Sequence, residues 1–205
     1  KAWYCSDKIP ALYRKPVGTG NNYKTAKRTG DSLGVNQIDF NSWFLAMKDT
    51  TRELLYSRQG IHWTNYGAVL AADSMITIIE HATHKKMRHP VWTKVTRTTE
   101  TMMPDNDMAE ILNLIFPISK DTFSYPQVHF EPDSGAWKPK CIYIGDSYFI
   151  NLLRMNIVRN IHAEWQLWFY FRDVFNQSNY DGPANYPQIA KCNWKAELDS
   201  ADCVI

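Results

Sequence analysis

Residues Cys141–Tyr148 read CIYIGDSY, and this stretch decides the fold that we expect. Its first four residues form a continuous apolar run, which is typical of a strand covered on both faces of a parallel sheet. The Gly-Asp-Ser turn that follows would place the hydroxyl of Ser147 where the strand gives way to a helix. A serine exposed at a strand-to-helix turn is typical of the nucleophile in acyl-transfer enzymes.

A second stretch, Gly60–Gly67, reads GIHWTNYG and supplies a histidine. A serine hydroxyl is a weak nucleophile at neutral pH, so it needs an imidazole that can accept its proton. We therefore predict that His62 is the general base for Ser147. The alternatives are a serine that merely caps a helix and a histidine that is hydrogen-bonded inside a rigid loop.

The rest of the chain predicts strands that alternate with helices. The expected elements are strands at 35–40, 141–144 and 202–205, helices from 41 or 42 to about 56, from 66 to 84 and from Asp105 onward, a mostly helical segment at 149–175, and a long loop at 10–30. This order favours a single α/β domain over residues 1–205, in which helices flank a parallel sheet in three layers.

The composition excludes some partners. The 205 residues carry 23 basic and 21 acidic side chains, a formal net charge of +2. This balance gives no field that would attract nucleic acid, so we predict no nucleic-acid partner. The 8 Trp, 11 Tyr and 9 Phe residues suit a carbohydrate site as well as an ordinary core. No apolar run is long enough to span a bilayer.

The cysteines and histidines do not predict a metal centre. The cysteines form no CxxC pair and no array with histidine, so we expect neither a metal nor a cofactor. They are Cys5, Cys141, Cys192 and Cys203. Cys141 and Cys203 lie in or beside apolar runs and are expected to be small buried side chains. The sequence leaves open whether Cys5 and Cys192 form a disulfide.

At the two motifs the chain resembles the SGNH-hydrolase superfamily. It is more closely similar to the rearranged branch typified by alginate O-acetyltransferases and related polysaccharide acetylation proteins. In that branch a His-Trp pair comes early and a Gly-Asp-Ser block comes late, as His62-Trp63 and Gly145-Asp146-Ser147 do here. The resemblance implies an SGNH or flavodoxin-like fold, in a truncated or permuted version.

The resemblance also implies roles for particular residues. Ser147 and His62 would be catalytic, and Trp63 and Tyr148 would bind substrate. Gly145 and Asp146 would support the nucleophile turn. Ser147 would also offer its backbone N–H to the oxyanion. Asp146 is expected to brace the turn through local hydrogen bonds rather than to contact substrate.

One position departs from the family pattern. The acidic member of the triad usually lies two residues before the histidine, and here that position is Gly60. His62 would then be oriented by a backbone carbonyl, by a carboxylate such as Asp39 or Asp73, or by nothing. Loss of the orienting acid can cost several orders of magnitude in rate.

A second Gly-Asp-Ser sequence needs a separate explanation. Residues Gly30–Leu33 read GDSL, the namesake tetrapeptide of the superfamily. The segment before it, 24–29, is polar and cationic, whereas a nucleophile turn must follow a buried strand. We therefore predict that Ser32 is a loop residue outside the site.

These features lead to two hypotheses of function. The first is an SGNH-like O-acetyltransferase or acetylesterase that acts on a polysaccharide through an acyl group on Ser147. The second is a catalytically weak or inactive carbohydrate-binding or scaffold component of an envelope polysaccharide system, which Gly60 favours. The expected partners are a polysaccharide or acetylated glycan and a membrane acyl-donor protein. The resemblance implies an extracytoplasmic location, in the periplasm or cell envelope, with the signal or anchor absent from this chain.

Overall fold

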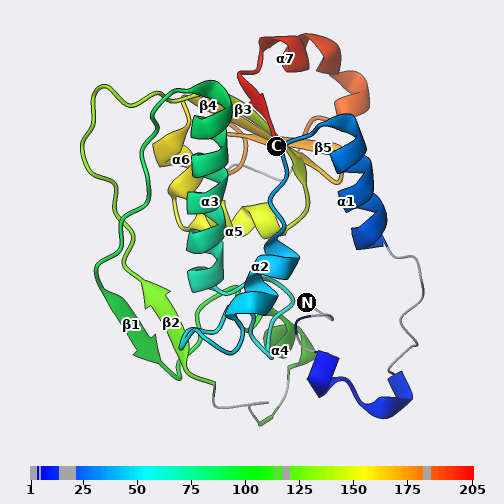
Figure 1. Cartoon of the computed structure of the whole chain (residues 1–205), viewed down its shortest axis with the longest axis vertical. Helices are drawn as coiled ribbons and strands as arrows, with labels where there is room; N and C mark the ends of the chain where they lie inside the picture. Colours follow the sequence, from blue (N-terminus) through cyan, green and yellow to red (C-terminus); the bar gives the residue numbers. More distant parts are fainter. Residues whose placement is uncertain (1–3, 5, 14–21, 114, 117–120, 182–185) are drawn as a thin grey trace.

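The computed structural model describes residues 4, 6–13, 22–113, 115–116, 121–181 and 186–205 (Figure 1). Its larger sheet has the strand order β5-β4-β3-β6. The strands span Lys140–Gly145 (β3), Glu164–Phe169 (β4), Asp173–Asn176 (β5) and Cys203–Val204 (β6). β3 pairs in parallel with both β4 and β6, and β5 pairs antiparallel with β4. A smaller antiparallel sheet joins β1 (Val95–Thr98) to β2 (Phe123–Pro126).

The helices connect and cover these strands. The α-helices span Asn22–Leu33 (α1), Phe40–Met47 (α2), Asn65–Thr83 (α3), Asp107–Leu112 (α4), Tyr148–Arg154 (α5), Ile157–Ile161 (α6) and Trp194–Ser200 (α7). The 3-10 helices span Ser6–Lys8 (η1), Ala11–Tyr13 (η2) and Ile189–Lys191 (η3). Within the described ranges, no helix is both long and apolar enough to cross a membrane.

The larger sheet is buried on both faces, which gives three layers. On one face Cys141, Tyr143, Trp165 and Leu167 pack against buried residues of α3, α5 and α6. On the other face, Ile142, Trp168 and Val174 pack with Ile189, and α7 contributes Leu198. This alternation explains why β3 reads as a continuous apolar run, since both faces are covered. The predicted α/β fold with helices flanking a parallel sheet is confirmed, apart from the antiparallel edge strand β5.

The prediction of a mostly helical segment over 149–175 is wrong. The helical part is short because Asn156 adopts φ 58° directly after α5, and the chain then turns into α6 and β4. In β4 the apolar side chains alternate between the two cores, Trp165 and Leu167 on one side and Trp168 on the other. Pairing with β3 therefore overrides an apolar pattern that also fits a helix.

The region before α3 also differs from the prediction. No strand forms at 35–40, because Asp39 caps α2 by accepting a hydrogen bond from the Ser42 backbone N–H at 3.0 Å. α2 ends at Met47 rather than near residue 56. Part of the expected loop at 10–30 is the helix α1, so Ser32 lies on a helix and not in a loop.

Other predictions lie closer to the structure. The predicted helix at 66–84 corresponds to α3 and the strand at 202–205 to β6. The helix expected from Asp105 is the short α4, Asp107–Leu112, on which Ile111 is 75% exposed. Cys141, Cys192 and Cys203 are free thiols, and the bridge between Cys5 and Cys192 falls outside the described residues.

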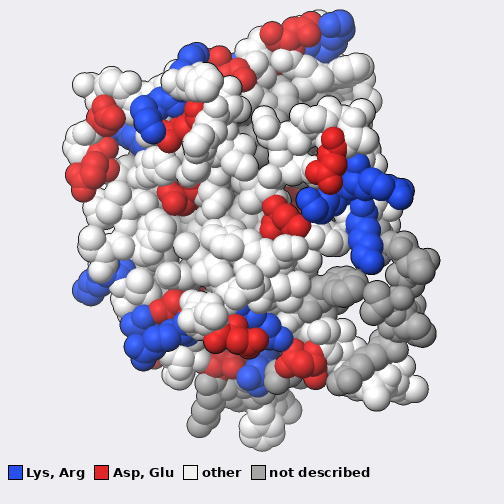
Figure 2. All heavy atoms as spheres, in the orientation of Figure 1, with Lys and Arg blue, Asp and Glu red and all other residues white. Residues whose placement is uncertain are grey.

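Figure 2 shows charged side chains of both signs on this face. Blue and red groups are interspersed, with broad uncharged areas between them, apart from one blue group over α1. This distribution agrees with the net charge of +2.

Candidate active site

Ser147 lies where the sequence places it, between β3 and α5. β3 ends at Gly145, and Ser147 is the N-cap residue of α5 without using its side chain as a cap. Its hydroxyl is therefore left for other partners. Asp146 braces the turn, because its Oδ1 accepts a hydrogen bond from the Tyr148 backbone N–H at 3.0 Å. A Cβ at Gly145 would meet nothing within 4 Å, so the approach to the turn at that position is open.

His62 lies on the connection between α2 and α3, which is anchored at both sides of the histidine. Tyr56 and Trp63 form an antiparallel bridge across the loop, and the Thr64 backbone N–H donates to the Leu55 carbonyl at 3.0 Å. The Thr64 hydroxyl caps α3 by accepting from the Gly67 N–H at 3.1 Å. These contacts fix where the imidazole can point. Its Nε2 lies 2.7 Å from Ser147 Oγ, so the two residues predicted to act together are in hydrogen-bond contact.

The other imidazole nitrogen contacts a carboxylate that the sequence analysis did not select. His62 Nδ1 and Asp107 Oδ2 form a short hydrogen bond, and the Ile61 backbone N–H donates to Asp107 Oδ1 at 2.9 Å. The side chains of His62 and Asp107 are only 13% and 10% exposed. Ser147, His62 and Asp107 thus form a continuous hydrogen-bonded chain of hydroxyl, imidazole and carboxylate, the arrangement of a serine triad.

Asp107 is held in place by the loop that carries His62. The Gln59 carbonyl accepts from the backbone N–H groups of Met108 and Ala109, both at 3.0 Å, in the first turn of α4. A Cβ at Gly60 would lie 2.9 Å from both Asp107 Oδ1 and the Pro104 carbonyl oxygen. The absence of a side chain at Gly60 therefore leaves the space that the Asp107 carboxylate needs.

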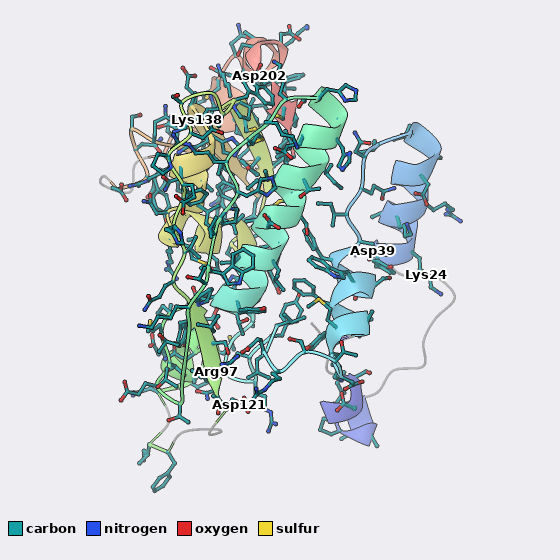
Figure 3. The ribbon with its side chains drawn as sticks, turned by 60° about the vertical axis from the view of Figure 1, so that its left-hand side comes forward. Lys24, Asp39, Arg97, Asp121, Lys138 and Asp202 are labelled. Atoms are coloured by element: carbon teal, nitrogen blue, oxygen red, sulfur yellow. The ribbon has the colours of Figure 1, made fainter. Side chains whose placement is uncertain are left out.

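The two carboxylates considered from the sequence lie elsewhere. Asp39 caps α2 and accepts a hydrogen bond from the Tyr23 hydroxyl at 2.6 Å, and Figure 3 places it beside α1 and α2. Asp73 contacts His89 Nδ1 at 2.6 Å. One sequence signal could have identified Asp107, namely an acidic residue in the first turn of a helix expected to start at Asp105.

The Tyr148 ring packs against both His62 and Trp63. The Tyr148 ring lies edge-on to His62 at 5.1 Å and to Trp63 at 5.2 Å between centroids. The Tyr148 hydroxyl donates to the Ile61 carbonyl at 2.6 Å, and burial raises its pKa, so it stays protonated as a donor. Trp63 is 8% exposed and Tyr148 is half-buried. Their contact with substrate stays a prediction, and in this structure they fix the histidine loop to α5.

A second carboxylate, Asp105, lies behind the triad and is 1% exposed. Burial raises its pKa to about 6, although hydrogen bonds from Tyr125 and Asn65 oppose that rise. Its carbonyl oxygen accepts from the Ser57 hydroxyl. The segment that ends in Asp107 is therefore anchored through Asp105 to α3, β2 and the loop before His62.

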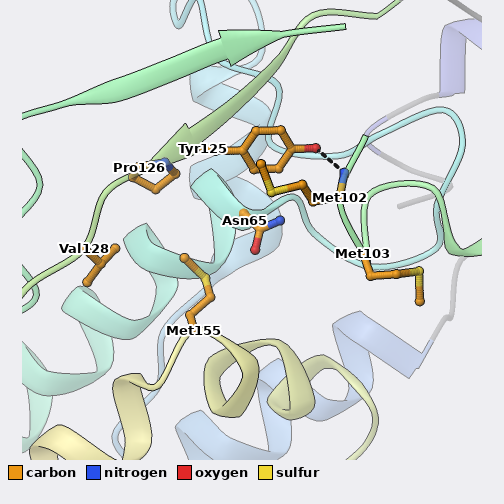
Figure 4. Close-up of a pocket in the computed structure, with 7 residues that line it drawn as sticks. All are labelled: Asn65, Met102, Met103, Tyr125, Pro126, Val128 and Met155. Atoms are coloured by element: carbon orange, nitrogen blue, oxygen red, sulfur yellow. Dashed lines mark hydrogen bonds between the residues drawn. The ribbon is translucent and has the colours of Figure 1, made fainter. Parts of the chain in front are cut away.

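A cavity of about 240 Å³ lies beside this segment (Figure 4). It is lined by Asn65, Met102, Met103, Tyr125, Pro126, Val128 and Met155, a lining that does not include the three triad residues. The Met102 backbone N–H donates to the Tyr125 hydroxyl at 2.8 Å across it. Among the residues that the structure describes, no group of three or more His, Cys, Asp or Glu side chains is arranged to hold a metal ion.

Comparisons with known proteins agree with this fold. No family model and no curated protein sequence matches the chain. Among solved structures, the O-acetyltransferase domain of Pseudomonas putida AlgJ is similar, with a TM-score of 0.50 and 13% identity over 82% of this chain and 59% of that chain. Pseudomonas aeruginosa AlgX gives a TM-score of 0.41 with 13% identity over 71% of this chain and 35% of that chain. The chain thus spans less than two thirds of the length of either neighbour.

The resemblance inferred from the two motifs is therefore confirmed at the level of the fold. One of the two motifs lies at the end of β3 and the start of α5, and the other, His62-Trp63, lies just before α3. This chain is similar in fold to the O-acetyltransferase domain of Pseudomonas putida AlgJ.

Proposed function

We propose that this protein is a serine acyl-ester enzyme that transfers or removes an O-acetyl group on a polysaccharide. The observation that carries the proposal is the hydrogen-bonded chain from Ser147 through His62 to Asp107. The likeness in fold to an O-acetyltransferase domain supports the choice of an acetyl group and a polysaccharide. An extracytoplasmic site of action and a membrane-bound acyl donor belong to the same proposal.

The chemistry follows from the geometry. Ser147 Oγ attacks the ester carbonyl carbon while His62 Nε2 takes the hydroxyl proton, and the carbonyl oxygen becomes an oxyanion that the Ser147 N–H helps to hold. When the ester C–O bond breaks, Nε2 gives its proton to the leaving oxygen and the acetyl group stays on Oγ. Water or a sugar hydroxyl then attacks this acyl-serine, with Nε2 again taking the proton.

Asp107 acts by orienting the base. A carboxylate that accepts from Nδ1–H leaves Nε2 unprotonated and facing the serine, and it stabilises the imidazolium that forms during the reaction. The hypothesis of an inactive scaffold was favoured by Gly60, which carries no acid. The contact between Asp107 and His62 removes that reason, so we propose an active enzyme.

The test is whether acyl transfer depends on Ser147. With 4-nitrophenyl acetate as the donor, Ser147→Ala should lose about three orders of magnitude or more in turnover. Intact-mass measurement of the wild-type protein during turnover should show the mass of one acetyl group, located on Ser147 by peptide analysis.

Ser32→Ala is a matched control, because Ser32 belongs to the literal GDSL sequence but lies exposed on α1. It should leave turnover unchanged. Equal turnover by Ser147→Ala and the wild type would overturn the proposal.

A further inference from the structure

The turn between β4 and β5 carries two exposed aromatic residues next to the nucleophile turn. Tyr170 is 65% and Phe171 57% exposed. The Tyr170 backbone N–H donates to the Gly145 carbonyl at 2.8 Å, and Phe169 pairs with Gly145 across the parallel strands. Because Gly145 is two residues before Ser147, the two turns lie within about 7 Å along the chain. The aromatic turn and the candidate nucleophile therefore share the carboxyl end of the sheet.

The backbone of this turn is strained. The Arg172 N–H donates to the Phe169 carbonyl at 3.0 Å, and the two residues between them, Tyr170 and Phe171, have φ values of 51° and 54°. A tight hairpin turn with both central residues at positive φ favours Asn-Gly, because a Cβ comes too close to the following carbonyl oxygen there and Asn tolerates this conformation better than most residues. Such positions cost roughly 1 kcal/mol or more each and are found most often at functional sites.

Burial does not offset this strain, since both rings are more than half exposed. Each ring is nevertheless held against a neighbour. The Tyr170 ring packs edge-on to Phe169 at 4.5 Å, and the Phe171 ring packs edge-on to Trp168 at 5.9 Å between centroids. Edge-on packing supports each side chain and leaves ring surface accessible to solvent. Neither local conformation nor core packing explains why two aromatic residues occupy this turn.

The neighbouring surface favours a ligand without a strong charge requirement. The Arg172 guanidinium donates from Nε and Nη2 to Asp173 Oδ2 at 2.9 and 2.7 Å, so its charge is already paired. Gly145, on the strand next to the turn, leaves open space where a side chain would otherwise project. An aromatic face is electron-rich and attracts the polarised C–H groups on the face of a sugar ring, whose hydroxyls stay hydrated at the rim.

We propose that Tyr170 and Phe171 form a platform on which a pyranose ring of the polysaccharide substrate stacks, placing a neighbouring O-acetyl or hydroxyl group near Ser147. This inference rests on the proposed function, because it assigns the saccharide site of the same reaction. The platform supplies affinity for the chain, and the triad supplies the chemistry. An acidic and a neutral chain share the pyranose face that the rings would bind.

The test measures binding without turnover. In the Ser147→Ala background, calorimetric titration with an alginate hexasaccharide and with xylohexaose covers an acidic and a neutral pyranose chain. The decisive variant adds Tyr170→Asn and Phe171→Gly, which gives the turn the residues that its backbone prefers. Relief of the backbone strain should offset the lost ring contacts, and a melting temperature close to that of the parent separates a loss of binding from unfolding.

We expect at least one of the two chains to bind, and the double substitution to weaken that binding at least tenfold, the size found for the loss of an aromatic stacking partner. Trp194→Ala is the matched control. Trp194 is 49% exposed on α7, and α7 contacts Lys140 at the opposite end of β3 through Ser200. Removing its ring should leave binding unchanged. Preference for the acidic or the neutral chain would identify the substrate class.

Three outcomes would overturn the platform. They are no binding of either hexasaccharide, binding that survives the double substitution, and an equal loss in Trp194→Ala. The proposed function fails separately, if Ser147→Ala still turns over 4-nitrophenyl acetate while the hexasaccharide binds as expected.

Discussion

Gly60 and Asp107 fit together without room for a side chain between them. A Cβ at residue 60 would approach Asp107 Oδ1 to 2.9 Å and the Asp105 carbonyl oxygen to 3.0 Å. The space that a side chain at residue 60 would take is thus occupied by the carboxylate of Asp107, which lies on α4. From the sequence alone, Gly60 indicates a missing carboxylate. In the structure, the same glycine leaves the space that the Asp107 carboxylate occupies.

Gly60→Ala should therefore reduce activity by displacing Asp107. A misplacement of about 1 Å in a catalytic group can cost about a hundredfold in rate, and we expect a loss of at least that size in kcat for 4-nitrophenyl acetate. Forcing a methyl group into this contact should also lower the free energy of unfolding by about 1–3 kcal/mol. Steady-state kinetics and urea denaturation measure the two effects.

Gly34→Ala is the control for stability alone. Gly34 has φ 66° and open space around it, so alanine there is strained but touches nothing in the site. It should lower stability by about 1 kcal/mol and leave kcat unchanged. Gly60→Asp puts a carboxylate at the position that the resemblance predicts, and its kcat should fall at least as far as that of Gly60→Ala. Wild-type kcat in Gly60→Asp would show that the space at residue 60 is not needed by Asp107.

Asp107→Asn tests the orienting role directly. The amide keeps the shape of the carboxylate but can hold the imidazole in the wrong tautomer, and the comparable change in a serine triad costs about 10⁴ in kcat. We expect a loss of that order with little change in KM. Asp39→Asn and Asp73→Asn, at carboxylates that contact Ser42 and His89 instead, should stay within tenfold of wild type. A small effect in Asp107→Asn would mean that His62 is oriented by another group.

Part of the fold and of the site was predictable from local pattern. The apolar run before Ser147 is buried on both faces, so it predicts a central strand whatever its neighbours are. The helix α3 has a long apolar periodicity, and its predicted bounds of 66–84 differ from Asn65–Thr83 by one residue at each end. Ser147 and His62 each lie in a motif whose residues are local in sequence.

The rest depends on contacts between distant segments. β4 is a strand because it pairs with β3, and an apolar segment of this length fits a helix equally well until that partner is known. Asp107 is separated from His62 by forty-five positions and becomes recognisable only when Gln59 contacts α4. The strain at Tyr170 and Phe171 has no sequence signal, because positive φ is a property of the folded turn.

Asp105 should make stability fall as the pH rises. Burial raises its pKa to about 6 in the folded protein, whereas an unfolded chain has a value near 3.9. Between these pH values the folded state binds more protons than the unfolded state. The contribution of Asp105 to the free energy of unfolding is therefore fully present below about pH 4 and is lost as the pH rises through 6. The total loss is about 3 kcal/mol at most. Urea denaturation of the wild type and Asp105→Asn at pH 4 to 7 measures this difference.

The variant cannot ionise, so its stability should approach that of the wild type as the pH rises. At low pH it should be the less stable protein, because an amide cannot accept all the hydrogen bonds that Asn65 and Tyr125 donate. Parallel curves over the whole range would show that Asp105 does not titrate between 4 and 6 in the folded protein.

Glu53 should have the opposite pH dependence. It is 8% exposed, and hydrogen bonds from Arg97 and Ser124 outweigh the effect of burial and lower its pKa. A lowered pKa gives stability that is present above the unfolded value near 4.3 and is lost as the pH falls through the folded value. Glu53→Gln should therefore cost about 1–3 kcal/mol at pH 7, since it weakens two hydrogen bonds to a charged acceptor.

The two carboxylates can be compared in the same buffers. Arg97 is about half exposed, which screens its charge and favours the lower part of the range for Glu53. The cost of Glu53→Gln should shrink toward pH 3, whereas the cost of Asp105→Asn should shrink toward pH 7. Glu53 contacts Arg97 of β1 and Ser124 of β2 rather than the triad, so kcat should change little while stability changes. A loss of kcat as large as that of Asp107→Asn would instead place Glu53 in the support of the triad.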